Sequence, residues 1–561
     1  ALPYIRTLFS YFSVDSIIEI VIQFNNYRII ECNTGGLMTS FLFPLTGMRI
    51  KLARFLIILP LSLVFLFHLA VDVYAEGKRG GTLRVAMNRA FDGFDTATNP
   101  TVFPTKLNVQ RAIFEDLFGV DKTGKLVPKL GTSLKISSDQ KLFTVTLRKD
   151  TKFSNGEPLT ARAYSDHFKR AMKSPRANFI KGQIGPVEDV VAVNDHTIEF
   201  RMSRPHPAFR AALTGPFQFF WVNAPDHAKS LGLFVSKLPV GTGPYMLDDW
   251  DQGVSLTLVR NPHYRHPEKQ FLDKIVMPLV AREEARLNGL RAGNLDLYIT
   301  NSGKLAKLAQ SDPGIEVFAQ VDQGSGIVAL DTSKPPFNDV RVRKALAHAV
   351  NREVEVKAAL GGVGGILATD WFGPKSKWFC GGNTGYPEFN PKKAEALLKE
   401  YGKPVKFKLA VLSFPVFLVG AQVYQSFWKR VGIQVELDVR TPGPSWVLPL
   451  LRGGFQAFFL GIGGAVDPGF QAQNLHSNSG GNFFKFSHPE VDKALEATYK
   501  PFEDKVKRKE AFCNFVTTVI KHQPFLLRYH NTFYSVSRTY VKGPKKPVFK
   551  MSHLHEMWLD K

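Results

Sequence analysis

Three short stretches of the chain carry residue types and spacings that could do chemistry. Ser138 and Lys141 have the Ser-x-x-Lys spacing of a nucleophile and its base. Residues 361–365, Gly-Gly-Val-Gly-Gly, are rich enough in glycine to suggest a phosphate loop. A third group could ligate a metal ion: His553, His555 and Glu556. The sequence contains no Gly-x-Ser-x-Gly elbow and no His-Glu-x-x-His helix.

Each of the three stretches has a plainer interpretation. Residues 138–141 lie in a polar turn before an alternating strand, which indicates a hairpin. No Lys-Ser/Thr pair follows residues 361–365 and no strand precedes them, so a flexible crossover loop near the ligand is favoured. Three ligating residues in four positions do not fix a metal geometry. We therefore predict no catalytic residue, no metal site and no cofactor.

The stretch from Lys141 to Ala161 is the most informative local pattern. In residues 142–147 apolar and polar side chains alternate, which predicts a half-buried strand. An Asn155-Gly156 turn follows, and Thr160 is placed to cap a helix that runs through Met172. Similar patterns recur along the chain and predict an α/β protein. The further strands are expected at 82–87, 197–202, 255–260 and 433–439, and helices at 107–118, 340–350 and 421–429.

Residues 141–161 resemble the signature of the family 5 extracellular solute-binding proteins, the oligopeptide, dipeptide and nickel binders of ABC importers. Four further landmarks resemble that family and fall in its order. They are Val-Gly-Thr-Gly-Pro-Tyr at 240–245, Arg-Asn-Pro-His-Tyr at 260–264, the helix start at 337–345, and Phe-Asn-Pro-Lys-Lys-Ala at 389–394. The resemblance covers nearly everything from residue 80 to the C-terminus.

The resemblance implies a two-lobed periplasmic-binding-protein fold of class II, with an extra subdomain inserted in lobe I. The lobes would close on a ligand about a hinge of two chain segments. The chain would cross to lobe II at residues 328–332. The implied segments are lobe I at 76–120, the subdomain at 121–239, lobe I again at 240–329, lobe II at 330–528, and a lobe I return at 529–561.

The first 75 residues do not resemble the family. A basic segment from Met48 to Arg54, an uncharged run from 55 to 70 and Val73-Tyr-Ala75 have the order of a secretory signal peptide. We expect cleavage before Glu76, and an uncleaved membrane anchor is the alternative. Residues 1–47 are interpreted as an upstream extension, with Met48 as the true start. This leader predicts a periplasmic protein.

The remaining residues are strongly basic. Residues 1–75 hold five of the 72 Lys/Arg and four of the 49 Asp/Glu, so the rest carries 67 and 45, a net charge of +22. Because these basic residues are dispersed rather than interleaved with aromatics, we expect no nucleic-acid partner. The excess can still favour an anionic ligand. Only Cys380 and Cys513 follow the leader, and the sequence leaves open whether they pair or stay buried as thiols.

The resemblance also draws attention to a loop in which this chain departs from its relatives. Peptide binders of the family place an aspartate, which receives the peptide ammonium, four residues before a proline. Here that position is Gly464, although Asp467-Pro468 is kept. The arginine that dipeptide binders use for the carboxylate has no match, because residues 414–418 are apolar. A ligand held by a free N-terminus is therefore disfavoured. The alternative is that Asp467 itself takes the ammonium.

The resemblance implies further ligand-facing positions, each of which could equally belong to a hydrophobic core. Aromatic faces with a few polar groups suit a sugar ring, a peptide-like conjugate or a nonpolar ligand. The candidates are Phe91, Phe94, Asp95, Trp371, Phe372, Arg440, Trp446, Gly464, Asp467, Asn482, Phe483 and Phe484.

The function that these observations favour is a monomeric periplasmic binding protein, not an enzyme. It would deliver a peptide-like solute to an inner-membrane ABC permease with its ATPase subunits. The first alternative is the same role for an oligosaccharide, an opine-like conjugate or a metal chelate. The second alternative is a secreted enzyme or a chaperone-like periplasmic protein.

Overall fold

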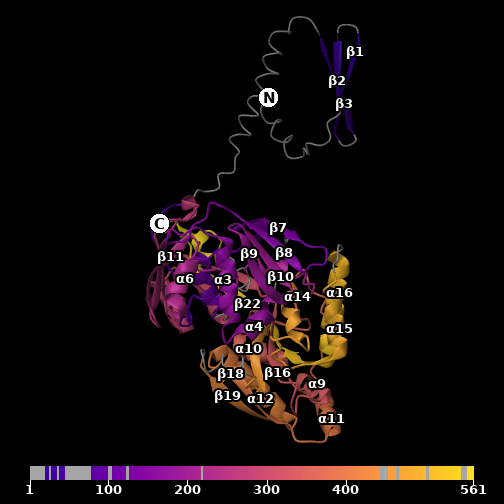
Figure 1. Cartoon of the computed structure of the whole chain (residues 1–561). Coiled ribbons are helices and arrows are strands. Elements are labelled where there is room, and N and C mark those ends of the chain that lie inside the picture. The colour runs from indigo at the N-terminus through magenta and orange to yellow at the C-terminus, as the bar shows by residue number, and fades with distance from the viewer. Residues whose placement is uncertain are drawn as a thin grey trace. The chain divides into compact units, whose positions relative to one another are not determined.

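A computed structural model describes most of the chain. The described residues are 19–24, 27–34, 37–44, 77–98, 104–121, 125–215, 219–441, 446, 449, 453–462, 467–500, 505–544 and 553–561. Within these residues, no helix has the length and apolar character that crossing a membrane requires. Contacts divide the chain into two units, residues 1–76 and 77–561 (Figure 1).

The first unit contains a three-stranded antiparallel sheet of order β1-β2-β3. Its strands are β1 (Glu19–Phe24), β2 (Tyr27–Thr34) and β3 (Leu37–Pro44). The expected signal peptide, residues 48–75, lies outside the described residues, so its cleavage stays a prediction.

In the second unit, lobe I is built on two sheets. One has the order β11-β12-β13-β4 and the other the order β14-β22-β15. Helix α2 (Pro104–Ile113) lies beside β11, and helix α8 (Gly303–Gln310) lies beside β15. The first sheet comprises β4 (Thr82–Arg84), β11 (Tyr245–Asp251), β12 (Ser255–Arg260) and β13 (Lys274–Pro278). The second comprises β14 (Leu297–Thr300), β15 (Ile315–Val321) and β22 (Tyr529–Arg538).

The subdomain is a four-stranded antiparallel sheet of order β7-β8-β10-β9. Its strand β8 (Leu142–Leu147) and helix α3 (Ala161–Met172) realise the predicted 141–161 pattern. Phe143, Val145 and Leu147 are buried in the subdomain core, as the alternation requires. The other elements are β7 (Gly131–Ile136), β9 (Val187–Asn194), β10 (Thr197–Met202), α4 (Ala177–Ile184) and α5 (Phe209–Ala212).

Two predictions about this hairpin and helix have different outcomes. Residues 138–141 form the turn between β7 and β8, which confirms the hairpin and removes the Ser-x-x-Lys interpretation. Thr160 is the residue before α3, but its side chain makes no capping hydrogen bond. The predicted position is therefore correct and the predicted cap is wrong.

Lobe II is built on a five-stranded mixed sheet of order β19-β18-β20-β16-β21. Figure 1 shows β18 and β19 with α9, α11 and α12 at one end of this unit, away from β7 to β10. The strands are β16 (Ser325–Leu330), β18 (Lys406–Leu412), β19 (Gln434–Arg440), β20 (Ala457–Ile462) and β21 (Phe525–Leu527). The helices include α9 (Val340–His348), α10 (Arg352–Leu360), α11 (Pro391–Tyr401), α12 (Pro415–Arg430), α15 (Pro489–Ala497) and α16 (Lys505–His522).

A disulfide bond answers the question that the sequence left open about the cysteines. Cys380 and Cys513 are bonded, with their Cα atoms 5.4 Å apart. Since Cys513 lies on α16, the bond ties that helix to the loop before α11. The disulfide therefore cross-links two parts of lobe II that lie 133 positions apart in the sequence.

The chain passes between the lobes at two places. It leaves β15 of lobe I and enters β16 of lobe II through Asp322, and it returns from β21 to β22 at Arg528. Arg528 N–H donates to the Gly326 carbonyl at 2.8 Å, so the two crossings lie side by side. Strand β16, which the sequence interpretation placed in lobe I up to residue 329, belongs to the lobe II sheet. The other proposed boundaries stay predictions.

Candidate functional site

The subdomain and lobe II meet through two glycines. Gly182 lies on α4 and Gly481 lies in the loop before α15. A Cβ atom added to Gly182 would come within 2.5 Å of the Gly481 backbone nitrogen, so only glycine permits this approach. Helix α14 (Gly469–Ala472) of lobe II also contacts α4 and α5. The two bodies therefore touch backbone to backbone.

The rings of Tyr499 and His206 extend this contact. The Arg204 guanidinium lies 4.6 Å from the centre of the Tyr499 ring across the same boundary, and the His206 ring lies 6.1 Å from it. His206 is fully buried, and neither of its ring nitrogens has a hydrogen-bond partner. Burial, with Arg204 and Arg508 nearby, lowers the pKa of His206 to about 3. This contact therefore encloses a neutral imidazole.

A cavity of about 540 Å³ lies at this boundary. Its lining comes from both bodies: Arg204 and Pro205 from the subdomain, and His476, Asn478, Ser479, Glu496, Tyr499 and Lys500 from lobe II.

Asp467, the retained aspartate of the predicted binding loop, is held by Arg508 of α16. Its two carboxylate oxygens accept from the two terminal guanidinium nitrogens at 2.5 and 2.8 Å, and one also accepts from the Gly469 N–H at 3.1 Å. Both side chains are buried. Since Arg508 engages both oxygens in bidentate fashion, the carboxylate already has a strong charged partner. Gly464, the glycine of the same loop, lies outside the described residues.

The predicted aromatic residues pack in hydrophobic cores. Phe94 is fully buried and packs with Phe91 and Trp250 at 4.5 and 5.4 Å between ring centres. Trp371 stacks on Phe372 at 6.2 Å and belongs to the lobe II core. The core also includes Trp446 and Phe484, while Phe483 is partly buried against it. Their role as ligand platforms stays a prediction.

The remaining predicted polar residues serve the local structure. Asp95 pairs with Arg170 at 2.7 Å and accepts from the Thr98 hydroxyl at 2.6 Å. The Asn482 amide donates to the Phe486 carbonyl and accepts from its N–H, which closes a turn. Arg440 pairs with Asp438 at 2.7 Å and lies 5.0 Å from the Phe455 ring centre.

Sequence reasoning missed a group of cations around Asp92, in the loop before α2. Lys106 is completely buried and lies 3.1 Å from the Asp92 carboxylate. Arg89 and Arg176 also interact electrostatically with Asp92. Arg89 stands two positions before the predicted Phe91, and a buried lysine on a helix is unusual enough to mark the place.

Burial governs the protonation of these cations. It lowers the pKa of Lys106 to about 8, although Asp92 acts in the opposite direction. Burial likewise lowers the pKa of Arg89 and of Arg176, again against the effect of Asp92. Asp92 acts against this effect of burial on all three cations, and Asp95 does so on Lys106 as well.

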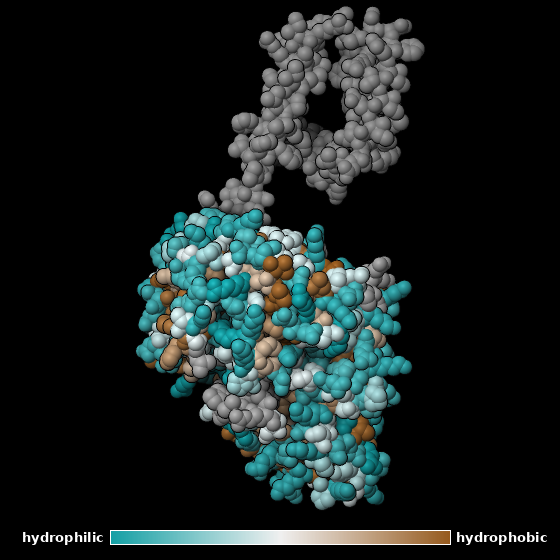
Figure 2. Space-filling model, in the orientation of Figure 1, coloured by the Kyte–Doolittle hydropathy of each residue, from teal (hydrophilic) through white to brown (hydrophobic). Residues whose placement is uncertain are grey.

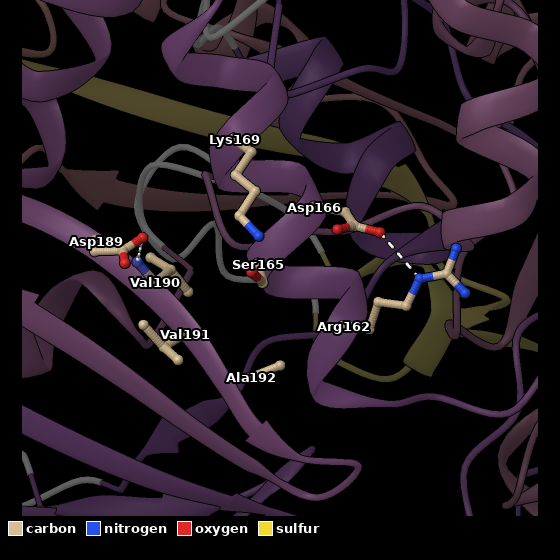
Figure 3. Close-up of a pocket in the computed structure, with 8 residues that line it drawn as sticks. All are labelled: Arg162, Ser165, Asp166, Lys169, Asp189, Val190, Val191 and Ala192. Atoms are coloured by element: carbon tan, nitrogen blue, oxygen red, sulfur yellow. Dashed lines mark hydrogen bonds and ion pairs between the residues drawn. The ribbon is translucent and has the colours of Figure 1, made fainter.

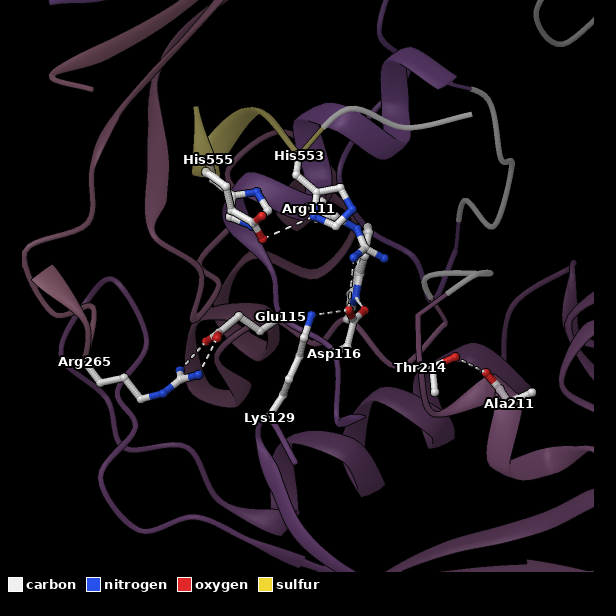
Figure 4. Close-up of polar contacts among 11 residues, drawn as sticks. Arg111, Glu115, Asp116, Lys129, Ala211, Thr214, Arg265, His553 and His555 are labelled. Carbon is white, nitrogen blue, oxygen red and sulfur yellow. Dashed lines mark hydrogen bonds and ion pairs between the residues drawn. The ribbon is translucent and has the colours of Figure 1, made fainter. Parts of the chain in front are cut away.

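Two other polar regions of the second unit consist of paired charges. A groove of about 270 Å³ lies between α3 and β9, and Figure 3 shows its Arg162 bonded to Asp166 on the same helix. In lobe I, Glu115 pairs in bidentate fashion with Arg265 at 2.6 Å (Figure 4). Although burial raises it, Arg111 and Lys129 together lower the pKa of Asp116.

Among the described residues, two clusters have the donors that a metal ion requires. One is His488, Glu490 and His522, and the other is the predicted group of His553, His555 and Glu556. In the second, the histidine nitrogens lie 3.2 and 3.4 Å from one Glu556 oxygen, so internal hydrogen bonds already account for it. Arg111 lies beside the two histidines in Figure 4, which disfavours a cation there.

One face of this unit is visible in the space-filling view of Figure 2. Figure 2 shows hydrophilic residues over most of the visible face, with hydrophobic residues in small groups.

Comparisons with known proteins agree on one family. The sequence profile of the bacterial extracellular solute-binding proteins, family 5 Middle, matches residues 125–484. The chain is 28% identical over 410 residues to the glutathione-binding protein GsiB of Escherichia coli K12, covering 70% of this chain and 78% of that protein. It is 27% identical over 365 residues to the nickel-binding periplasmic protein of the same strain, covering 60% and 68%. Among solved structures, the periplasmic binding protein DppA of Helicobacter pylori, in complex with the peptide STSA, is similar with a TM-score of 0.77. That likeness has 22% identity and covers 87% of this chain and all of the other.

Proposed function

Because this chain belongs to the bacterial extracellular solute-binding proteins of family 5, we propose that it captures a small solute between its two lobes. It then delivers the solute to an inner-membrane ABC permease. The observation that carries the proposal is the contact between Gly182 and Gly481, which brings the subdomain and lobe II together backbone to backbone. Closure of two lobes about a ligand is a recognised class of motion, and this contact joins the two bodies that such closure would bring together.

The two crossings at Asp322 and Arg528 supply the hinge. Because they lie side by side, a rotation about them moves lobe II as one body. Closing would bury His206 and the Arg204–Tyr499 contact, and opening would return them to water. A solute that bridges the lobes stabilises the closed arrangement by its differential affinity for it.

The solute is not an ordinary free peptide gripped at its N-terminus. Gly464 offers no carboxylate to an ammonium group, and Asp467 is already engaged by Arg508. A buried charge without its partner costs about 3–5 kcal/mol, or roughly two to four decades in affinity. By their names, the two relatives bind nickel and glutathione, and DppA is in complex with a peptide. These ligands differ in chemistry, so we transfer only their small size to the solute of this chain. Blocked peptides, conjugates, sugars and metal chelates are all of that size.

Small-angle scattering tests the proposal directly. Protein purified from the periplasm should retain its solute, which native mass spectrometry identifies. Adding that solute to stripped protein should lower the radius of gyration, and the solute should be recovered chemically unchanged. No change in radius at saturation would remove hinge closure, and turnover of the solute would make the protein an enzyme.

Calorimetry with paired peptides tests the ligand class. Trialanine should bind weakly or not at all, whereas its N-acetylated form avoids the cost of an unpaired ammonium. The variant Gly464→Asp should raise the affinity for trialanine by supplying the missing charge. Submicromolar binding of unblocked trialanine by the natural protein would overturn this assignment and favour Asp467 as the ammonium partner.

The periplasmic location implies processing of the leader. We propose that the mature protein begins at Glu76, because Val73-Tyr-Ala75 has the pattern of a cleavage site. N-terminal sequencing of the exported protein checks this, and a start before Met48 would contradict both the cleavage and the start site.

A further inference from the structure

Two histidines and a glutamate lie together where helix α15 begins and helix α16 ends. His488 is the residue before α15, Glu490 lies in its first turn, and His522 is the last residue of α16. One ligand atom from each of the three lies within 4.8 Å of the other two. Because the two helices pack side by side (Figure 1), the cluster joins residues that are 32 positions apart in the sequence.

The fold holds both imidazole rings in place. The His522 carbonyl accepts from two guanidinium nitrogens of Arg343, at 2.7 and 3.1 Å, which fixes the end of α16. His488 caps α15, because its Nδ1 accepts from the Glu490 N–H at 3.2 Å, and its ring stacks on Phe486. The centres of the two imidazole rings are 3.7 Å apart. The histidines are therefore positioned as a pair before any ligand binds.

The Glu490 carboxylate completes the cluster on its exposed side. One of its oxygens lies 2.9 Å from His522 Nε2 and 2.8 Å from Lys521 Nζ. The Lys521 side chain is 61% exposed and flexible, so it can turn into water at little cost. The carboxylate oxygen is then available to another cation.

Both histidines can present a lone pair to a metal ion. The tautomer of His522 with its proton on Nδ1 offers a lone pair at Nε2, beside the carboxylate. Whichever nitrogen of His488 binds an ion, Nδ1 loses the cap hydrogen bond, because it then carries the ion or the proton. Glu490 is exposed, so water can replace His488 as the acceptor of its N–H.

We propose that His488, Glu490 and His522 bind one divalent transition-metal ion, of which Zn²⁺ is the representative. Two imidazole nitrogens and one carboxylate are a ligand set that proteins use for Zn²⁺, with water in the fourth position. Imidazole selects this class of ion against Mg²⁺ and Ca²⁺, which prefer oxygen ligands. All three ligands belong to lobe II, so the ion is not the solute held between the lobes, and the inference does not depend on the proposed function.

The cluster at 553–556 differs from this one in two respects. Its ligands all lie within one short turn, and Arg111 lies beside them (Figure 4). Arg111 is only 11% exposed and pairs with Asp116 at 3.3 Å, so it stays in place where Lys521 can leave. An ion at 553–556 would meet a fixed positive charge. That cluster therefore serves as an internal control.

A bound ion would tie the start of α15 to the end of α16. The disulfide at Cys513 already ties α16 to the loop before α11. The loop before α15 carries Gly481, which touches Gly182 of the subdomain. The ion would thus add a second cross-link to the same helix and steady the segment on which the lobes meet.

Zinc added to metal-free protein tests the site. The protein is treated with EDTA, dialysed, and then unfolded thermally with Zn²⁺ or with Mg²⁺ at the same concentration. We expect Zn²⁺ to raise the Tm and calorimetry to show one tight site, whereas Mg²⁺ should leave the Tm unchanged. The absence of a shift with Zn²⁺, or an equal shift with Mg²⁺, would overturn the proposal.

Three variants separate binding from folding. His488→Asn removes an imidazole but keeps a side chain that caps helices well. This variant and His522→Gln should each lower the zinc affinity at least tenfold, since even the outer-shell partners of a metal are worth that much. His553→Gln is the matched control and should leave the zinc affinity unchanged. Each variant is compared with its own metal-free Tm. Natural affinity in both His488→Asn and His522→Gln, or a loss in His553→Gln, would contradict the assignment.

Two further measurements define the ligands and the place of the ion. Lys521→Ala should raise the zinc affinity severalfold, because it removes a cation that competes for Glu490. A lower affinity in this variant would contradict the role of Glu490. In small-angle scattering, Zn²⁺ alone should leave the radius of gyration unchanged. Compaction by Zn²⁺ would place the ion between the lobes and overturn its assignment to lobe II.

Discussion

In lobe II, Arg528 and Arg508 each face one buried carboxylate, whereas in lobe I three cations share Asp92. The Arg528 guanidinium contacts Glu355, and both are buried almost completely. Although burial lowers it, the neighbouring Glu355 raises the pKa of Arg528. Around Asp92 the balance is different, because burial lowers the pKa of all three cations.

The two regions differ in how buried charge is arranged: one carboxylate for each arginine in lobe II, and several cations around one carboxylate in lobe I. A matched pair satisfies both partners and leaves nothing for a solute, so its loss destabilises the folded chain. Burial of a charged residue alone therefore does not mark a site, because structural ion pairs also perturb pKa values.

The largest expected effect is on the matched pair. Glu355→Gln leaves the Arg528 charge buried without a counter-charge, which should lower the free energy of unfolding by about 3–5 kcal/mol. Urea unfolding followed by circular dichroism measures it. Glu436→Gln is the control, since that carboxylate is 57% exposed and pairs with Lys408, and it should cost about 0–1 kcal/mol. Equal losses of unfolding free energy in the two variants would contradict the stabilising role of the buried Arg528–Glu355 pair.

Removal of the disulfide should have the second-largest effect on the free energy of unfolding. Cys380→Ser with Cys513→Ser frees a loop of 133 positions, and loss of such a bond typically costs about 2–5 kcal/mol. The comparison becomes sharper if stability falls while binding of the retained solute is preserved. The reduced natural protein should unfold like the double variant. A loss of solute binding would show that the disulfide also supports the closed arrangement.

The contact between the two bodies can be broken with one methyl group. Gly182→Ala should weaken solute binding by at least tenfold, because its Cβ would collide with Gly481 and prevent full closure. The open protein should unfold normally or gain up to about 1 kcal/mol, since alanine favours a helix over glycine. Calorimetry and scattering measure the two effects. Lys181→Ala, at the exposed neighbouring position, is the control. An equal loss of solute affinity in the two variants would rule out impaired closure as the cause.

A smaller effect is expected from pH. His206 is neutral in the closed contact, with a pKa of about 3, and opening would return it toward its ordinary 6.5. The open state then binds the extra proton, so affinity is full above pH 6.5 and falls as the pH decreases toward 3. At pH 5 the loss is at most about 30-fold if the ordinary pKa is fully restored. Titrations at pH 7.5 and 5 check this. The variant His206→Gln should lose this pH dependence of affinity, whereas His263→Gln, at an exposed histidine, should keep it. An affinity of the natural protein that does not change with pH would refute the role of His206.

Local patterns predicted much of the fold. Strands at 197–202 and 255–260 coincide with β10 and β12, because alternation fixes a half-buried strand without knowledge of its partners. Asp339 caps α9 through its side chain, as predicted for the 340–350 helix. The expected helix at 107–118 instead occupies 104–113. It ends before Phe114, which packs against Trp221 of a distant segment.

The site was less predictable, for a physical reason. Phe94 and Trp371 stand in loops, where no periodicity shows whether a ring turns toward the core or the solvent. Of the cations around Asp92, Arg176 comes from a distant segment, and Arg89 meets Phe414 only once both lobes are folded. Charge balance is a sum over such neighbours, so it becomes visible only in the structure.

The contact between Gly182 and Gly481 has a consequence for the permease. Glycines have no side chain, so this junction cannot report which solute is inside; it can report only that the lobes have come together. We therefore expect the membrane partner to recognise one surface, common to every solute that allows closure. Discrimination among solutes would then occur entirely inside the protein, before docking, and chemically different cargoes would share a single route across the membrane.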